Sequence, residues 1–330
     1  MKPSPAERLQ EYLNLKGLDG LAPPGGVKLR ELRLNEKQGL SNKTFLLKVE
    51  LEDGSVRDLI LRMYVGDGKK ASREFRVLKF LRGKGLPVPM VYLLEESCKV
   101  LDKPFIVMEK IDPSPVEDMG DLVDAAAKSL VEIHRIDRDE LEGILKVKED
   151  YPSRDLKGVK ALSVISALST LKSPLTFMRY LKYAGELERT PVEARLRLIH
   201  GDYGFDNIIY SGGRAYVIDW ESVDVAEPTY DVAYAYNFLD FEDKMSGRSE
   251  DRLSDMFLEA YERYGGTLRD FQYYRRLAAL KLLVIFDAVM SPGLIALIAK
   301  EFRKLMKNQE FKLFIGRFKE YLLRVLRKVS

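Results

Sequence analysis

The sequence predicts an α+β fold of two lobes, with strands in the first third of the chain and helices in the rest. Two patterns predict this. Between residues 27 and 111, short segments of alternating apolar and polar side chains are separated by turn sequences, as in antiparallel sheets. From about residue 118 the apolar residues recur at helical spacing, interrupted only by one short hairpin. A length of 330 residues leaves room for two lobes.

The composition narrows the class of protein. The chain has 54 basic and 51 acidic residues, and a net charge of only +3 argues against bulk binding of nucleic acid. Its single cysteine, Cys98, excludes an intramolecular disulfide and fits a reducing, cytoplasmic compartment. Because there are only two histidines, we expect any metal to be held by oxygen ligands.

The N-terminal residues predict a capped helix and not a signal peptide, because charges interrupt them and no apolar core follows. Ser4 can cap this helix, Pro5 suits its first position, Glu7 completes a capping box and Gly17 can end it. The most apolar segment, residues 277–299, contains charges and a Pro-Gly pair. We therefore expect a pair of core helices there and no membrane span.

Five strands and one helix are expected in the first lobe. Three strands lie between residues 27 and 64, separated by the turns "KQGLSN" and "EDGS". A helix follows in "ASREFRVLKFLRGKG", with Phe75, Leu78 and Leu81 on one face. The segments "PVPMVYLLEE" and "KPFIVMEKI" then complete a five-stranded antiparallel sheet.

The hairpin "LIHGDYGFDNIIYSGGRAYVIDWE" carries most of the chemistry. Its Gly-Gly turn would bring Asn207 beside Asp219, as oxygen ligands for a divalent cation, with Asp202 just upstream. Mg²⁺ is the expected ion, because it binds one or two protein oxygens together with substrate phosphates. Asp202 would then accept the proton of a hydroxyl nucleophile. A plain hairpin is the alternative, since Asp and Asn are common at strand ends, but it does not explain the whole ordered set.

The sequence "HGD", with Asn207 five residues after its aspartate, and the later "IDWE" resemble the catalytic core of the aminoglycoside phosphotransferase and choline kinase family. These proteins are relatives of the protein kinases. The resemblance implies a protein-kinase-like fold, with a nucleotide-binding lobe at residues 1–112 and a helical lobe with the catalytic loop and acceptor site at residues 113–330. It further implies ATP, or another nucleoside triphosphate, and Mg²⁺ as cofactors. Asp202 would be the base, and Asn207 and Asp219 the metal ligands.

Two further residues of this region are expected to be structural. The stretch "EPTYDVAYA" is similar to the family's Asp-Pro-x-x-Asp-Leu-Ala, with Glu227 in place of the first aspartate. Asp231 would clamp the catalytic loop, and His200 would brace it by hydrogen bonds.

The turn "KQGLSNKT" resembles the family's phosphate-binding turn. Gly39 permits close approach of the backbone, and the amides through Ser41 and Asn42 could form an anion-binding nest. A plain hairpin turn is the alternative. At the end of the fifth strand, backbone groups of Glu109 and Ile111 are expected to bind the adenine edge.

Arg62 is expected to reach the α and β phosphates, because strand alternation places it on the same face as Ile60 and its forked donors suit phosphate oxygens. A surface arginine is the alternative. Glu74 is its expected partner; otherwise Glu74 would face solvent and pair with Arg73 or Arg76.

The acceptor is expected to be a small hydroxylated metabolite of the aminoglycoside, choline or sugar type. Only 11 residues separate Asp219 from Asp231, too few for a peptide-binding platform, and Gly204 stands where protein serine/threonine kinases carry a lysine. An acidic and aromatic set could favour an amine-bearing acceptor, unless its aromatic members belong to the core. The candidate residues for this set are Glu221, Asp224, Tyr230, Tyr234, Asp240, Glu242 and Asp243.

Other functions on the same fold remain alternatives: a nucleotide-binding regulator that has lost transfer, or a small atypical protein kinase. The basic C-terminal helix could touch an anionic membrane or nucleic acid, but packing of its apolar stripe on the second lobe is favoured. That stripe consists of Phe311, Phe314, Phe318, Leu322 and Val325. No nucleic-acid partner is expected, and the oligomeric state is open.

Overall fold

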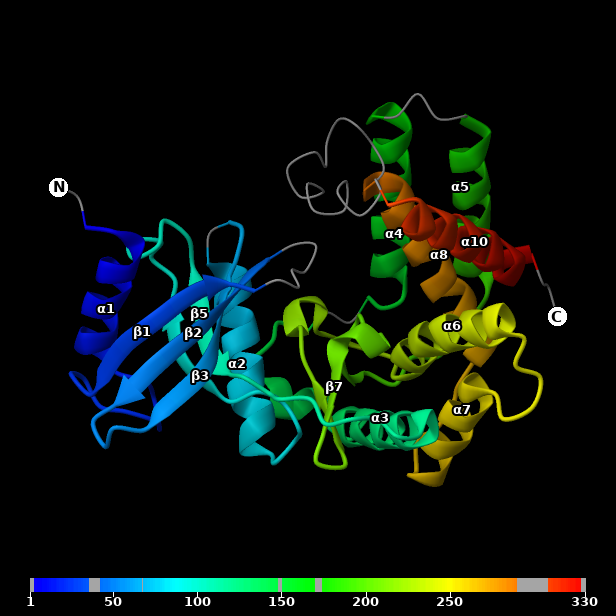
Figure 1. Ribbon diagram of the computed structural model, residues 1–330. Helices are drawn as coiled ribbons and strands as arrows, with labels where there is room; N and C mark the ends of the chain where they lie inside the picture. Colours follow the sequence, from blue (N-terminus) through cyan, green and yellow to red (C-terminus); the bar gives the residue numbers. More distant parts are fainter. Residues whose placement is uncertain are drawn as a thin grey trace. The chain divides into compact units, whose positions relative to one another are not determined.

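The computed structural model describes residues 3–35, 42–66, 68–147, 150–169, 174–289 and 308–327. It divides into two compact units (Figure 1). Met1–Ser114 and Tyr216–Glu221 form the first unit, and Pro115–Ala215 and Ser222–Ser330 form the second. The last residues of the hairpin, with "IDWE", thus belong to the first unit.

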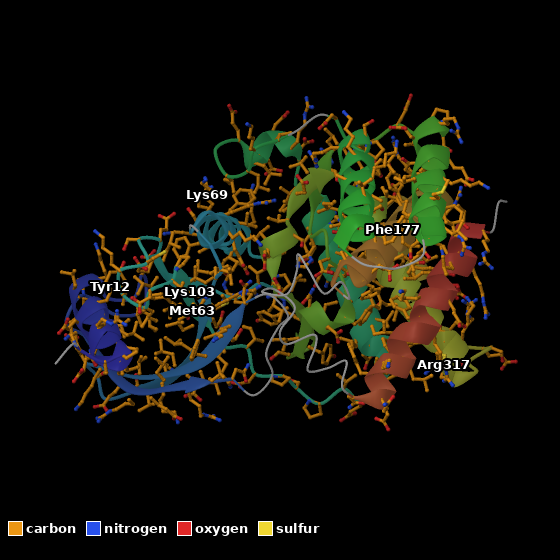
Figure 2. All side chains as sticks on the ribbon, turned by 90° about the horizontal axis from the view of Figure 1, so that it is seen from above. Tyr12, Met63, Lys69, Lys103, Phe177 and Arg317 are labelled. Carbon is orange, nitrogen blue, oxygen red and sulfur yellow. The ribbon has the colours of Figure 1, made fainter. Side chains whose placement is uncertain are left out.

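The first unit is built on a five-stranded antiparallel sheet, which confirms the predicted α+β class. Its strand order is β1-β2-β3-β5-β4. Figure 2 shows Met63 and Lys103 close together, where β3 ends and the chain enters β5, in agreement with the pairing of Met63 with Phe105. The strands are β1 (Val27–Leu34), β2 (Lys43–Leu51), β3 (Val56–Met63), β4 (Val91–Glu95) and β5 (Phe105–Glu109).

Helix α1 (Pro5–Lys16) begins and ends as predicted. Ser4 and Glu7 form the capping box, with Ser4 N donating to Glu7 Oε2 at 2.6 Å and Glu7 N donating to Ser4 Oγ at 3.3 Å. The helix ends at Gly17, whose φ is +67°. A Cβ there would lie 2.6 Å from the carbonyl oxygen of Ala22, so only glycine fits.

Helix α2 (Lys69–Gly83) packs on β4 and β5. Its buried residues are Ala71, Glu74, Val77, Leu78 and Leu81. The expected face is therefore wrong in one position: Phe75 is only half-buried, and the carboxylate Glu74 takes the inner place. A pattern of apolar residues could not reveal this, because the inward residue is charged.

In the second unit, helix α8 is the centre of the packing. Helices α4, α5, α6 and α10 all pack against it, and α3 packs against α7. The helices are α3 (Met119–His134), α4 (Ser153–Ser169), α5 (Pro174–Arg189), α6 (Thr229–Ser246), α7 (Leu253–Arg263), α8 (Phe271–Val289) and α10 (Gln309–Arg327).

The apolar segment at residues 277–299 is described only up to residue 289, and that part is a core helix, as predicted. Its expected second helix lies outside the described residues. Within the described ranges, no helix has both the length and the apolar content to cross a bilayer.

Two small sheets lie beside the helices. Strands β7 (Ile208–Ser211) and β8 (Arg214–Val217) form the predicted hairpin, with positive φ at both turn glycines. Strand β6 (Arg197–Ile199) pairs with β9 (Asp224–Ala226). The expectation that only the hairpin interrupts the helices is therefore wrong, because strands of three residues are too short to show an alternating pattern.

Helix α10 buries an apolar stripe against α8 and α6. Phe318, Leu322 and Val325 are buried as predicted, whereas Phe314 is 40% exposed. Arg317, labelled in Figure 2, lies exposed on its basic side. These contacts favour the packing interpretation of this helix.

Candidate active site in a phosphotransferase fold

Asp231, in the first turn of α6, holds the loop that carries Asp202. The Asp231 carboxylate accepts hydrogen bonds from the backbone amides of His200, at 2.6 Å, and Gly201, at 2.9 Å. His134 Nε2 contacts the same carboxylate at 3.3 Å. Asp231 is fully buried, so this charge is balanced by directed donors and not by water.

Gly201 can only be glycine in this loop. Its φ is +82°, and a Cβ on it would collide with the carbonyl oxygen of Ser222. The loop thus passes directly against the segment that leads into β9. Close approach of two backbones explains the glycine of the "HGD" sequence.

Asp202 itself is positioned by two side chains. Asn207 Nδ2 donates to the backbone carbonyl of Asp202 at 2.9 Å and lies 3.4 Å from its Oδ2. The hydroxyl of Tyr234, on α6, donates to Asp202 Oδ1. The sequence placed Tyr234 among the acceptor candidates but did not predict its contact with Asp202. Its place three residues after Asp231, on the same helix, was the available indication.

His200 is fully buried, and its ring packs edge-on against Tyr203 at 5.9 Å. The hydroxyl of Tyr203 donates to the carbonyl of Ala126 on α3 at 2.8 Å. This buried environment suits a structural role.

In the first unit, Arg62 lies among three carboxylates. Its guanidinium is 2.5 Å from Asp219, 3.6 Å from Glu74 and 3.8 Å from Glu221, and its side chain is 11% exposed. Burial alone would lower the pKa of Arg62, but Glu74 and Asp219 raise it well above its usual value. Arg62 is therefore a buried, permanently charged group and not a surface arginine.

Glu74 is buried and does not face solvent. Its carboxylate pairs with Arg62, accepts from the Tyr64 hydroxyl at 2.7 Å and contacts the backbone amide of Trp220 at 3.3 Å. Burial raises the pKa of Glu74, while the charge of Arg62 opposes the shift. Glu74 thus ties α2 both to β3 and to the "IDWE" segment.

Glu221 links Asn42, in the turn "KQGLSNKT", to Lys70 of α2. Asn42 Nδ2 donates to Glu221 Oε2 at 2.6 Å, and Lys70 pairs with Oε1. Gly39 and Ser41, expected in the same turn, lie outside the described residues. In this structure Glu221 contacts groups of the first unit.

Asp219 adopts a left-handed backbone conformation, with φ of +64°. Aspartate tolerates this region better than most residues, and such conformations are common at functional sites. Asp219 and Asn207 fall in different units. That they meet at one metal ion stays a prediction.

At the end of β5, Glu109 is engaged with its neighbours. Its backbone amide donates to the carbonyl of Met90 at 2.8 Å, and its carboxylate accepts from the amide of Met90 at 3.0 Å. An adenine contact through Glu109 would therefore use its carbonyl. Ile111 lies two residues beyond the strand.

Three of the other residues predicted to bind the acceptor are neutralised or buried. Arg154 pairs with Asp224 at 2.6 Å. Asp240 is 1% exposed and bonds to Arg252, Arg275 and Tyr321. Tyr230 is also 1% exposed, with Lys281 lying 4.3 Å over its ring. These contacts remove the charge argument for an amine-bearing acceptor.

Comparison with curated proteins gives distant relatives. The chain is 28% identical over 254 residues to mouse acyl-CoA dehydrogenase family member 10, covering 70% of this chain and 22% of the relative. It is 26% identical over 230 residues to chicken acyl-CoA dehydrogenase family member 11, covering 66% of this chain and 28% of the relative. The chain thus spans less than a third of these two proteins.

Solved structures share the fold. A protein of Ralstonia eutropha assigned as an aminoglycoside phosphotransferase aligns with a TM-score of 0.71 and 18% identity, covering 97% of both chains. The ethanolamine kinase of Plasmodium vivax aligns with a TM-score of 0.62 and 15% identity, covering 96% of this chain and 86% of its own. A spectinomycin phosphotransferase, solved with ADP and spectinomycin, aligns with a TM-score of 0.61 and 16% identity, covering 99% and 98%.

These alignments confirm the predicted kinase-like architecture. The family model described as the phosphotransferase enzyme family matches residues 37–280, a range that contains Arg62, Glu74, the "HGD" loop and "IDWE". The chain therefore belongs to the phosphotransferase enzyme family.

Proposed function

We propose that the protein transfers the γ-phosphoryl group of ATP to a hydroxyl of a small molecule, with Asp202 as the general base. The observation that carries the proposal is the support of Asp202. Its carboxylate is held by Tyr234 and Asn207, on a loop fixed by Asp231, within the segment that matches the phosphotransferase family. A base must be fixed within hydrogen-bond reach of the proton it removes.

The first unit supplies the groups for the nucleotide. Arg62 is charged, nearly buried and held by Glu74, so its forked donors are pre-organised for phosphate oxygens. Family membership and the ADP complex of the spectinomycin phosphotransferase support a nucleotide at this place. The further nucleotide contacts of the proposal are Gly39, Ser41, Asn42, Glu109 and Ile111.

The side-chain oxygens of Asn207 and Asp219 suit Mg²⁺, and these two residues would hold the ion. Asn207 uses its Nδ2 toward Asp202, which leaves Oδ1 as the ligand atom. The cluster around Asp219 contains three carboxylates and two cations, so its formal charge is net negative. The carboxylates are Glu74, Asp219 and Glu221, and the cations are Arg62 and Lys70. When bound, Mg²⁺ supplies charge neutralisation at the β and γ phosphate oxygens.

In the proposed step, the acceptor oxygen forms a bond to the γ-phosphorus while the bond between that phosphorus and the β,γ-bridging oxygen breaks. The acceptor's hydroxyl proton passes to Asp202, and ADP leaves. Arg62, oriented by its carboxylate partner Glu74, would hold the nucleotide phosphates during transfer. Catalysis of this kind depends on positioning and on neutralising charge.

The acceptor is proposed to be small, because the segment between Asp219 and Asp231 is short. Since Asp224 and Asp240 are neutralised within the protein, charge does not single out an amine-bearing acceptor. The panel of acceptors therefore includes aminoglycosides, amino alcohols and sugars. Hydroxylated acyl-CoA thioesters are included as well, because the curated relatives are named as acyl-CoA dehydrogenase family members.

The test measures ADP release with Mg-ATP and each acceptor, for the wild type and for Asp202→Asn. We expect the variant to lose at least about 1000-fold in turnover while ATP affinity changes less than about twofold. Asp206→Asn, an exposed aspartate of the same loop, is the matched control and should keep wild-type turnover.

Undiminished transfer by Asp202→Asn would show that Asp202 is not the base. Mg-ATP binding with no transfer to any acceptor would favour the regulator, and phosphate incorporated into protein would favour the atypical protein kinase.

A further inference from the structure

Tyr234 contacts the proposed base directly. It lies in the second turn of α6, and its hydroxyl donates a hydrogen bond to Asp202 Oδ1. The other carboxylate oxygen, Oδ2, is 3.4 Å from Asn207 Nδ2, a long and therefore weak contact. The two oxygens of Asp202 are thus not equivalent.

The ring of Tyr234 is held in place by its neighbours. It packs against Tyr230 at 6.3 Å and Phe238 at 5.3 Å between centroids, both on the same helix. On the loop side, a Cβ placed on Gly204 would lie 3.8 Å from the ring. A rigid aromatic ring can fix the position of its hydroxyl, and so the orientation of the carboxylate that accepts from it.

The hydroxyl of Tyr234 stays protonated at neutral pH. Burial raises the pKa of Tyr234 well above its ordinary value, and the charge of Asp202 raises it further. The other ionisable groups that act on Tyr234 are Tyr230 and Asp231, and both also favour the protonated hydroxyl. Tyr234 is therefore a permanent donor and not itself a base.

We propose that Tyr234 is a positioning residue for phosphoryl transfer, which occupies Oδ1 of Asp202 and leaves Oδ2 to receive the proton of the acceptor hydroxyl. The inference rests on the proposed function, because it assigns atoms within the same base. Tyr234 donates a hydrogen bond to the carboxylate and fixes its rotation.

The test is the steady-state kinetics of Tyr234→Phe, measured with the acceptor on which the wild type is active. Misorientation of the base should lower kcat about tenfold at neutral pH, while KM for ATP changes less than about twofold.

Tyr236→Phe is the matched control, because Tyr236 lies on the same helix and its ring packs on Phe271 and Arg275, away from Asp202. It should keep the wild-type kcat. An unchanged kcat in Tyr234→Phe, or a loss confined to KM for ATP, would overturn the positioning role. Either result could occur with a fully active wild type and an inactive Asp202→Asn, so failure of this inference differs from failure of the proposed function.

Discussion

The carboxylate of Asp231 accepts a hydrogen bond from the backbone amide of His200 at 2.6 Å, although 31 residues separate them in the chain. With Gly201 as a second donor, this contact anchors the loop that carries Asp202 to the first turn of α6. The same helix presents Tyr234 to Asp202. A single helix thus fixes both the backbone of the loop and the carboxylate it carries.

Replacement of Asp231 by Asn should destabilise the protein and reduce transfer. An amide can accept only one of the two backbone donors and turns its own NH₂ toward the other, leaving buried groups unpaired. We expect a loss of about 2–3 kcal/mol in the free energy of unfolding, measured by urea titration. Asp139→Asn, at a side chain that is 85% exposed, should change it by less than about 0.5 kcal/mol. Equal stability of the two variants would contradict the anchoring role.

Gly201→Ala, compared with a second glycine variant, tests whether Gly201 is required because a side chain would collide with the backbone or only because its φ is positive. The new methyl would meet the carbonyl of Ser222, so the loop must shift, and we expect a loss of about 3 kcal/mol with a lower kcat. Gly212→Ala is the control, because Gly212 also has positive φ but open space around it. It should cost only about 1 kcal/mol. Similar thermal shifts for both variants would mean that strain alone explains the glycine.

Arg62→Met should raise KM for ATP about tenfold or more, because it removes the buried cation that is proposed to bind the phosphates. Arg62→Lys keeps the charge but not the fork, so its KM should lie between those of the wild type and the Met variant. Arg57→Met, on an exposed position of the same strand, serves as control. Steady-state kinetics at varied ATP measures all three, and a KM effect only for the acceptor would contradict the assignment.

Asp240→Asn should lower stability in a pH-dependent manner. Burial by itself would raise the pKa of Asp240, but hydrogen bonds from Lys244 and Tyr321 and the charge of Arg275 lower it below 3.8. The stability from the ionised form is therefore complete above pH 3.8 and is lost as pH falls through the folded-state pKa. At pH 7 we expect a loss of about 3 kcal/mol.

Thermal unfolding of Asp240→Asn and wild type, followed from pH 7 to pH 3, measures this difference. The two curves should converge at the acidic end. A constant difference over the whole range would show that packing, and not ionisation, accounts for the loss.

The sequence by itself determined the class of fold and the chemistry of the candidate site. Local sequence patterns were sufficient for two features. Ser4 and Glu7 form the predicted capping box, and the alternating segments form the predicted five-stranded sheet. The spacing of Asp202, Asn207 and Asp219 indicated the family, because it resembles the order in which the family carries these groups along the chain.

Only the tertiary structure decided which charged groups are partners. It buried Glu74 against Arg62 where a solvent-facing glutamate was an alternative, and it neutralised Asp240 with cations from three parts of the second unit. It also brought Tyr234 to Asp202, 32 residues away in the chain. Such contacts join residues distant in sequence, and their energy depends on burial and distance, which no local pattern encodes.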